Sequence, residues 1–200
     1  MSALRHLKSV AVAAALTLTP AVAHAQAADP VLALFQSACV ATDGQANAAL
    51  AKLDAAGWDV LPPELMGDDV PFDNLQARMK FEDGGILIAM TGDMREGLGT
   101  LTSGGDVTAA VCAIGTAPGD YDAIDGAVAN WLGLSPNADM SSDGLRGYPY
   151  TTVNGQRRAV SPALSEDELL EVAASGDMRI VMTGDTDGVI MIMFMRPETR

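Results

Sequence analysis

Seven consecutive apolar residues, VIMIMFM, occupy positions 189–195 near the end of the chain. Because successive side chains of a β-strand point to opposite faces, both faces of this segment are apolar. A strand of this kind is typically buried on both sides, in the middle of a sheet. Residues 178–183 precede it across the turn-forming sequence GDTDG. We therefore expect the two segments to form a central antiparallel hairpin.

Five further segments have the composition or the two-residue alternation of strands. The turn dipeptides Asp83-Gly84 and Asn154-Gly155 join two pairs of them into hairpins. The five segments are residues 77–82, 85–91, 107–114, 148–153 and 156–160.

Four predicted helices alternate with these strands. The first begins at Asp29-Pro30, a capping residue followed by a proline suited to the first helical turn. The last begins at Ser165, which has the spacing of a capping box with Glu168. The remaining segments are helices over residues 45–56, capped by Asp43, and 120–132, and a polar loop over residues 135–147. These elements predict a single-domain α+β fold, with helices packed on an antiparallel sheet of about five to seven strands.

The first 25 residues have the three parts of a secretory signal peptide. A basic start at Arg5 and Lys8 precedes an apolar stretch at residues 10–18, which is too short to span a bilayer. The sequence Ala-His-Ala then predicts cleavage after Ala25, with Ala27 as the second choice. An uncleaved anchor is the alternative. The mature domain, residues 26–200, is expected to be periplasmic or extracellular.

Cleavage changes the composition that matters for function. The full chain has a net charge of −14, and loss of Arg5 and Lys8 leaves ten basic against 26 acidic residues, a net of −16. Such a charge disfavours nucleic acid and anionic membranes as partners. His6 and His24 both leave, so the mature chain has no histidine. Catalysis that needs an imidazole and ordinary zinc sites are therefore excluded, and no motif predicts a cofactor.

The two cysteines predict one disulfide, Cys39 to Cys112, because exported proteins fold in oxidising compartments. Use of either cysteine as a catalytic thiol is the rival interpretation. It lacks a Cys-x-x-Cys motif and a histidine to activate the thiol.

An internal duplication is one interpretation of two repeated patterns in the sequence. MTGD occurs at residues 90–93 and again at 182–185, each time after an apolar strand. Cys39 precedes Trp58 by 19 residues, and Cys112 precedes Trp131 by 19. The two copies would span about residues 39–100 and 112–195. Chance similarity between strand-and-turn segments is the alternative.

Three methionines in the apolar strand suggest a Cu(I) site. Met191, Met193 and Met195 share one face of the strand, and Met178 and Met182 could add ligands from the neighbouring strand. Thioether sulfur suits Cu(I). Methionine as filler of an aliphatic core is the competing interpretation, and the one we favour.

A second metal hypothesis concerns calcium. Asp139, Ser141 and Asp143 match the first three ligand positions of a calcium loop, and Gly144 follows as that loop requires. The pattern then fails, because Tyr150 stands where a bidentate glutamate is needed. Turn chemistry explains the same residues.

Without histidine, acid–base catalysis would depend on carboxylates, as in glycoside hydrolysis. The sequence offers many and selects none of them. The candidates are Asp68, Asp69, Asp73, Asp93, Glu96, Asp120, Asp122 and Asp125.

One hairpin combines aromatic and basic residues. Tyr148 and Tyr150 face Arg157 and Arg158 across the Asn154-Gly155 turn, so that a tyrosine can stack on an arginine. This composition suits contact with a protein or a glycan. Ordinary cross-strand pairing is the alternative.

Taken together, the sequence predicts an exported, acidic, non-catalytic binding or structural protein. Its expected partner is a protein or glycan, cationic if the net charge governs recognition. The alternatives are a carboxylate-dependent hydrolase and a Cu(I)- or calcium-binding protein.

Overall fold

A computed structural model describes residues 29–66, 72–82, 84–94, 107–186 and 188–199. The expected signal peptide, residues 1–25, lies outside this part of the chain, as do both cleavage points. None of the described helices is long and apolar enough to cross a membrane. In chain order the elements are α1 Pro30–Phe35, the π-helical turn η1 Gln36–Val40, α2 Ala46–Ala55, β1 Asp59–Val60, the 3-10 turn η2 Pro63–Leu65, β2 Phe72–Glu82, β3 Gly85–Met94, β4 Val107–Ala117, α3 Tyr121–Leu132, β5 Asn137–Ser142, β6 Leu145–Val153, β7 Gln156–Ala159, α4 Glu166–Ala174, β8 Met178–Thr186 and β9 Val189–Thr199.

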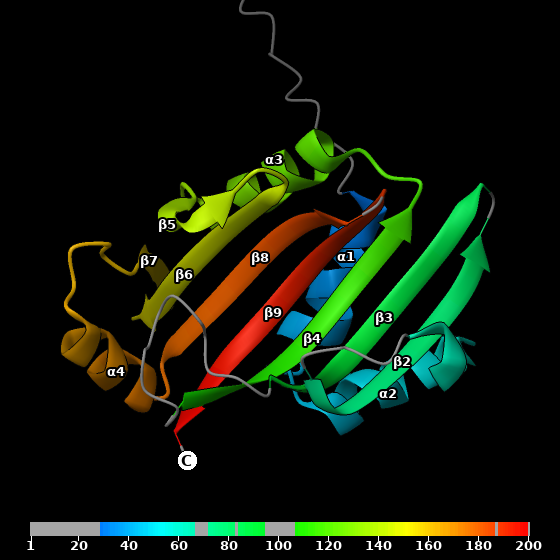
Figure 1. Cartoon of the computed structure of the whole chain (residues 1–200), viewed down its shortest axis with the longest axis horizontal. Coiled ribbons are helices and arrows are strands. Elements are labelled where there is room, and N and C mark those ends of the chain that lie inside the picture. Colours follow the sequence, from blue (N-terminus) through cyan, green and yellow to red (C-terminus); the bar gives the residue numbers. More distant parts are fainter. Residues whose placement is uncertain (1–28, 67–71, 83, 95–106, 187, 200) are drawn as a thin grey trace, which may run out of the picture.

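β9 lies in the middle of one antiparallel sheet, between β4 and β8 (Figure 1). The order across the sheet is β1-β2-β3-β4-β9-β8-β6-β5, and β7 pairs with the last four residues of β6. The predicted α+β class is confirmed, and so is the central position of residues 189–195.

The sheet has nine strands among the described residues, slightly more than the five to seven expected. β1 is only two residues long, and β5 falls within residues 135–147, so the prediction of a loop there is wrong. The Asn137 side chain accepts hydrogen bonds from the backbone N–H groups of Asp139 and Met140, and the register with β6 shifts along the strand. A short polar strand at a sheet edge has no hydrophobic alternation by which a sequence could reveal it.

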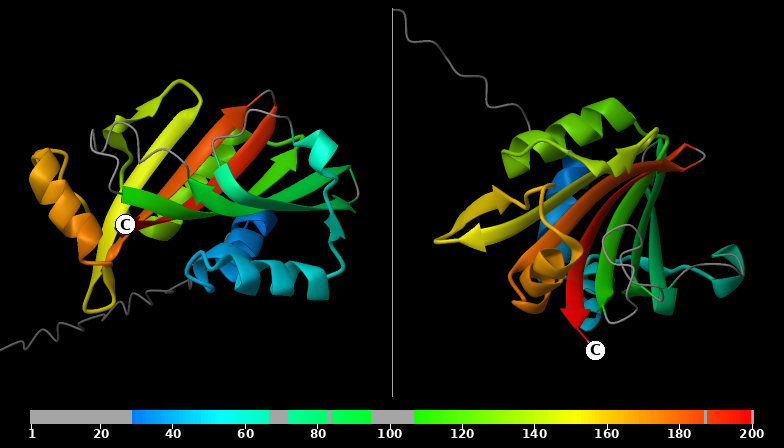
Figure 2. Two further views of the ribbon diagram at one scale, coloured as in Figure 1. Left: turned by 60° about the horizontal axis from the view of Figure 1, so that its bottom comes forward. Right: turned by 60° about the vertical axis from the view of Figure 1, so that its left-hand side comes forward.

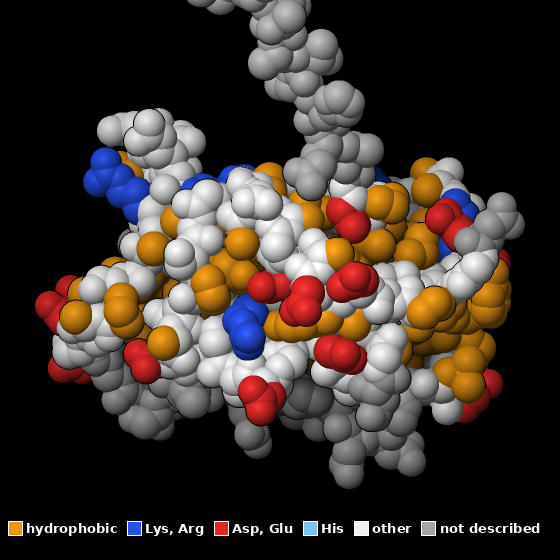
Figure 3. Space-filling view, turned by 90° about the horizontal axis from the view of Figure 1, so that it is seen from above, with side chains coloured by type: hydrophobic (Ala, Val, Ile, Leu, Met, Phe, Trp, Pro, Cys, Tyr) orange, Lys and Arg blue, Asp and Glu red, His pale blue; other side chains and the backbone are white. Residues whose placement is uncertain are grey.

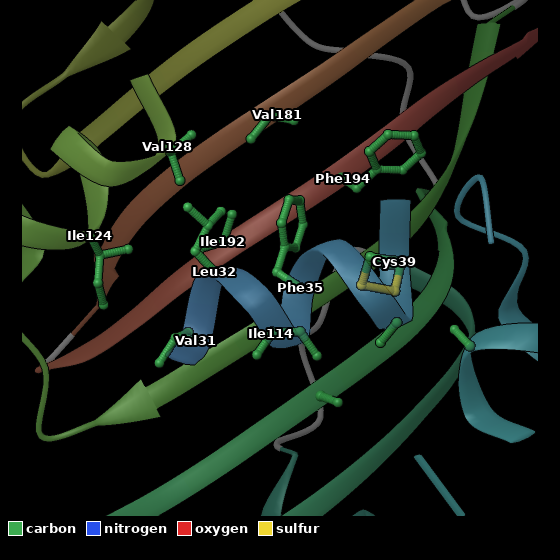
Figure 4. Close-up of a cluster of buried hydrophobic side chains, with 14 of the residues drawn as sticks. Val31, Leu32, Phe35, Cys39, Ile114, Ile124, Val128, Val181, Ile192 and Phe194 are labelled. Carbon is green, nitrogen blue, oxygen red and sulfur yellow. A yellow bond between two sulfur atoms is a disulfide. The ribbon is translucent and has the colours of Figure 1, made fainter. Parts of the chain in front are cut away.

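The first hydrophobic core lies between the sheet and the helices α1 and α3. Ile192 and Phe194 of β9 belong to it together with Phe35 of α1 and Val128 of α3, and all four are almost completely buried (Figure 4). Burying one such side chain contributes about 1.5–3 kcal/mol. α1 and α3 are therefore held on the same face of the sheet.

The second core lies on the opposite face and uses the alternate residues of β9. Met195 is buried there with Met178 and Ile180 of β8 and with Ala173 of α4. Figure 2 shows α4 at the β6 end of the sheet. Because β9 contributes to both cores, it is covered on both faces in its second half.

The N-terminal segment is tied to the sheet by the predicted disulfide. Cys39 in η1 is bonded to Cys112 in β4, and the two Cα atoms lie 5.4 Å apart. Both cysteines are buried, and the chain between them is long, with a separation of 73 residues. The bond fixes the helical start of the domain to a strand beside β9.

The two N-terminal helices differ in how they begin. The Asp29 carboxylate accepts hydrogen bonds from the N–H groups of Val31 and Leu32, so the predicted cap of α1 is confirmed. α2 begins after Gln45 with no side-chain cap. Asp43 binds Arg179 of β8 instead, so the prediction that Asp43 caps α2 is wrong. An ion pair with a strand that is remote in sequence has replaced the local cap.

The sheet order has an internal symmetry that bears on the duplication hypothesis. α1 is followed by the neighbouring strands β2, β3 and β4, and α3 by the neighbouring strands β6, β8 and β9. The two MTGD sequences lie in the corresponding strands β3 and β8. Cys39 lies in a helical turn, whereas Cys112 lies in a strand. Duplication stays a prediction, and the strands are the segments that it should align.

We expect loss of the disulfide to lower the free energy of unfolding by about 4 kcal/mol, because the bond closes a long loop in the unfolded chain. For a domain of this size the midpoint of thermal unfolding should fall by roughly 8–16 °C. The measurement is calorimetry of the wild type and of the double variant Cys39→Ala/Cys112→Ala, each with and without reductant. A wild-type midpoint that stays constant after complete reduction would contradict this expectation.

Candidate functional site

A cleft of about 700 Å³ opens between the N-terminal helical segment, the end of α3 and the strands β6, β7 and β8. Its apolar wall comes from Val40, Leu132 and Phe194. Its polar residues are Asp43, Tyr150, Thr152, Gln156, Arg157, Asp177 and Arg179. A volume in this range suits a small ligand or a short piece of a larger one.

The β6–β7 hairpin positions Arg157 at this cleft. Asn154 and Gly155 both have positive φ, as the tight two-residue hairpin turn requires. The register then places Arg157 opposite Thr152, on the face of the hairpin that carries Tyr150. Arg158 pairs with Thr151 on the other face and is exposed. The predicted contact patch is therefore divided between the two faces of the hairpin.

Arg157 is stacked on aromatic rings. Its guanidinium carbon lies 4.4 Å from the ring centroid of Trp131 and 5.8 Å from that of Tyr150. Its Nη1 also donates a 2.9 Å hydrogen bond to the Trp131 carbonyl oxygen. The Trp131 ring in turn packs edge-to-face on Phe35, with 6.0 Å between centroids. The guanidinium is thus held in one orientation by the hydrophobic core beneath it.

The charge around Arg157 is unusual for such an acidic protein. The chain has a net charge of −14, and acidic side chains gather in the middle of the face seen in Figure 3. Yet within the described part of the chain no carboxylate lies within ion-pair distance of Arg157. The site therefore presents one cation that no acidic side chain of the described residues neutralises.

Arg179, on the same cleft, is neutralised by Asp43. Its Nε and Nη2 donate to the two Asp43 carboxylate oxygens at 2.6 and 2.8 Å, and Arg196 adds a longer contact of 3.4 Å. Nη1 of Arg179 donates to the carbonyl oxygens of residues 176 and 178. Burial alone would raise the pKa of Asp43, but the bonds and charges of the two arginines outweigh it and lower the pKa. Asp43 is therefore ionised at neutral pH and acts as the counter-ion of Arg179.

Tyr150 lies at the centre of the site, and only 4% of its surface is exposed. Burial raises the pKa of its hydroxyl, against the opposing charges of Arg157 and Arg179. The hydroxyl therefore stays protonated at neutral pH and remains a hydrogen-bond donor.

The fourth predicted patch residue, Tyr148, belongs to a separate polar network. Its hydroxyl donates a 2.7 Å hydrogen bond to Oδ1 of Asp125 in α3, and the Thr183 hydroxyl donates to the same oxygen at 2.6 Å. Burial and the nearby Asp125 raise the pKa of Tyr148 well above its usual range. This network connects α3 to β6 and β8 beneath the helix.

The methionine row lies on the face of the sheet opposite the cleft. Met195 is buried in the second core, whereas Met191 and Met193 are half-buried. Met182 pairs directly with Met193, and Met178 is buried. The five thioethers therefore share a face, as predicted, and two of them fill the core. The Cu(I) hypothesis stays a prediction.

The residues of the calcium hypothesis form a β-hairpin. Asp139 and Ser141 lie in β5, and Asp143 lies in the turn before β6. The Ser141 hydroxyl donates to the Asn137 carbonyl oxygen and accepts from the Gly147 N–H, so the hairpin already uses it. Among the described residues no three His, Cys, Asp or Glu side chains form a group suited to a metal ion.

The candidate carboxylates are dispersed. Asp68, Asp69 and Glu96 lie outside the described residues. Asp73 and Asp93 are cross-strand partners in β2 and β3, and Asp120 caps α3. The remaining two, Asp122 and Asp125, lie on α3. None of these described carboxylates lines the cleft, whose acidic residues are Asp43 and Asp177.

Sequence reasoning found Tyr150 and Arg157 but missed Trp131, Asp43 and Arg179. Arg179 is 136 residues from Asp43, and no local pattern connects them. Comparisons with known protein families, curated proteins and solved structures found no match. The site must therefore be interpreted from its own geometry.

We expect Asp125→Ala to lower the free energy of unfolding by about 2–4 kcal/mol, because it leaves the buried hydroxyls of Tyr148 and Thr183 without an acceptor. Asp122→Ala, on the exposed side of the same helix, should change it by less than about 0.5 kcal/mol. Urea unfolding of both variants provides the test. Equal effects would show that the network does not hold α3 to the sheet.

The lowered pKa of Asp43 gives stability a dependence on pH. The Asp43 carboxylate has a lower pKa in the folded protein than in the unfolded chain, where the pKa is near 4. Its ion pair therefore stabilises the fold at pH values above the unfolded pKa, and this stabilisation is lost as the pH falls through the folded pKa. Asp43→Asn should therefore lower the free energy of unfolding by roughly 1 kcal/mol at pH 7. Below about pH 4 the free energies of unfolding of the variant and the wild type should approach each other. Urea unfolding from pH 7 to pH 3 measures this. A difference that stays constant over that range would contradict it.

Proposed function

We propose that this chain is an exported, non-catalytic binding protein whose ligand occupies the cleft beside Arg157. One observation carries the proposal: Arg157 is stacked on Trp131 and Tyr150, faces a cleft of about 700 Å³ and has no acidic partner among the described residues. A cation held in this way is prepared to receive an anionic group from outside the chain.

The chemistry of the cleft suggests what the ligand carries. The remaining N–H groups of Arg157 and the hydroxyl of Tyr150 are hydrogen-bond donors, which suits a carboxylate. Of the apolar lining, Leu132 and Phe194 are almost completely buried, so the apolar surface beside these donors is small and comes mainly from the half-buried Val40. We therefore propose a ligand with an anionic group and an apolar body, presented free or by a protein or glycan partner.

The protonation states favour binding over catalysis. General acid–base catalysis works best with a group whose pKa lies near the working pH. The pKa of Asp43 is lowered and that of Tyr150 is raised, so both keep one protonation state at neutral pH. These residues hold charges and hydrogen bonds in place and do not transfer protons.

Export is supported by the buried disulfide, which forms and persists in oxidising compartments. A periplasmic or extracellular location would also place the cleft where small solutes and cell-surface molecules occur. The net charge of −14 argues against nucleic acid as the partner.

We expect the protein to bind hexanoate in preference to hexanamide, which has the same apolar body without the charge. Arg157→Gln should weaken hexanoate binding by roughly 10- to 100-fold, the size of a lost charge-assisted hydrogen bond. Isothermal titration calorimetry is the measurement, and circular dichroism checks that each variant is folded.

Arg158→Gln is the matched control, because it removes the same charge from the neighbouring residue on the opposite face of the hairpin. Its affinity for hexanoate should stay within about twofold of the wild type, as expected for a remote surface charge. If both substitutions weakened hexanoate binding equally, the cause would be a general effect of charge and not recognition at the cleft. Equal affinity of the wild type for hexanoate and hexanamide would refute the proposal.

A further inference from the structure

We infer that the ligand of this cleft is zwitterionic, with its anionic group at Arg157 and a cationic group at Asp177. This inference rests on the proposed function and adds the chemical class of the ligand. Short peptides with free termini are the class that it fits, because they carry two opposite charges separated by an apolar body. Two charges of the cleft have no ion-pair partner among the described residues, and Arg157 is the first of them.

Asp177 is that second charge. It lines the same cleft as Arg157 and is exposed. Its backbone N–H donates to the Ser175 hydroxyl, while its carboxylate forms no ion pair with any described basic residue. The other two charged residues of the lining, Asp43 and Arg179, neutralise each other. Among the described residues, one cation and one anion of the cleft therefore remain without an ion-pair partner.

Strand pairing places these two charges on opposite sides of β6. Thr152 of β6 pairs with Arg157 of β7. On the other side of β6, Thr151 pairs with Met178, so the preceding residue, Asp177, lies beside Thr152. Neighbouring strands are about 4.8 Å apart, so the two backbone positions are separated by roughly 10 Å across β6. The two side chains form no ion pair with each other, because the Arg157 guanidinium is held against the Trp131 ring instead. A ligand with two opposite charges would therefore compensate both.

This spacing favours a peptide over a single amino acid. One residue of an extended chain spans about 3.3–3.6 Å, so the termini of a two- or three-residue peptide can approach both charges at once. The half-buried Val40 would then contact the side chains between the termini. Thr152, between the two charges, offers a hydroxyl to the peptide backbone.

Three dipeptides with the same apolar side chains test the contribution of each charge of the ligand separately. Leucyl-leucine carries both, N-acetyl-leucyl-leucine carries only the anion, and leucyl-leucinamide carries only the cation. By calorimetric titration at pH 7, the wild type should bind leucyl-leucine roughly fivefold more tightly than the acetylated form, the size of a partly exposed ion pair. The amide should bind most weakly, because it has no group for Arg157.

Variants assign the effect to Asp177. Asp177→Asn should remove the preference for leucyl-leucine over the acetylated form, while the affinity for the acetylated form stays within about twofold of the wild type. Arg157→Gln should weaken both ligands. Asp59→Asn, at β1 on the opposite edge of the sheet, removes the same charge and should leave the preference intact.

The outcomes distinguish this inference from the proposed function. Equal wild-type affinity for leucyl-leucine and its acetylated form would refute the inference of a zwitterionic ligand. It would not contradict the proposed anion site at Arg157. A preference that persists in Asp177→Asn would also refute that inference of a zwitterionic ligand. If none of the three probes bound at millimolar concentration and hexanoate also failed, the proposed function itself would fall.

Discussion

The burial of β9 on both faces is the constraint on which the rest of the domain depends. Its alternate side chains enter two different cores, so the sheet must be covered by α1 and α3 on one face and by α4 on the other. A strand so apolar must also lie in the interior of the sheet, which requires neighbours on both edges. β4 and β8 meet that requirement, and β4 additionally receives the disulfide from η1.

A feature of the fold could be predicted from the sequence where a few adjacent residues determine it. The central hairpin, the turn at Asn154-Gly155 and the capping box at Ser165 each follow from a few adjacent residues, and all are present. β5 was missed because polar edge strands lack alternation, and the role of Asp43 was missed because an aspartate before a helix resembles a cap. The cleft combines residues from six separate elements, and its composition could not be read from any one of them.

The cleft is tied to the rest of the domain by two residues whose role at this site the sequence did not reveal. Trp131 lies near the end of α3, packs on Phe35 and supports the guanidinium of Arg157 from below. Asp43 ties the segment after η1 to Arg179 of β8, and thereby removes one of the two arginines from competition for a ligand. The order of the site therefore comes from the same packing that orders the fold, which lowers the entropy cost of binding.

If the cleft binds a ligand as proposed, the overall charge would help to select among ligands. A protein with a net charge of −14 repels anions at long range, and a simple carboxylate must overcome that field before it reaches Arg157. A zwitterion has no net charge and is not repelled, and it also compensates Asp177, which a plain anion would leave facing its own charge. For the proposed site, the same acidity would therefore favour a zwitterion over a simple anion of equal size. In the proposed site, one stacked arginine and one aspartate, both without an ion-pair partner among the described residues, would distinguish a zwitterion from neutral molecules.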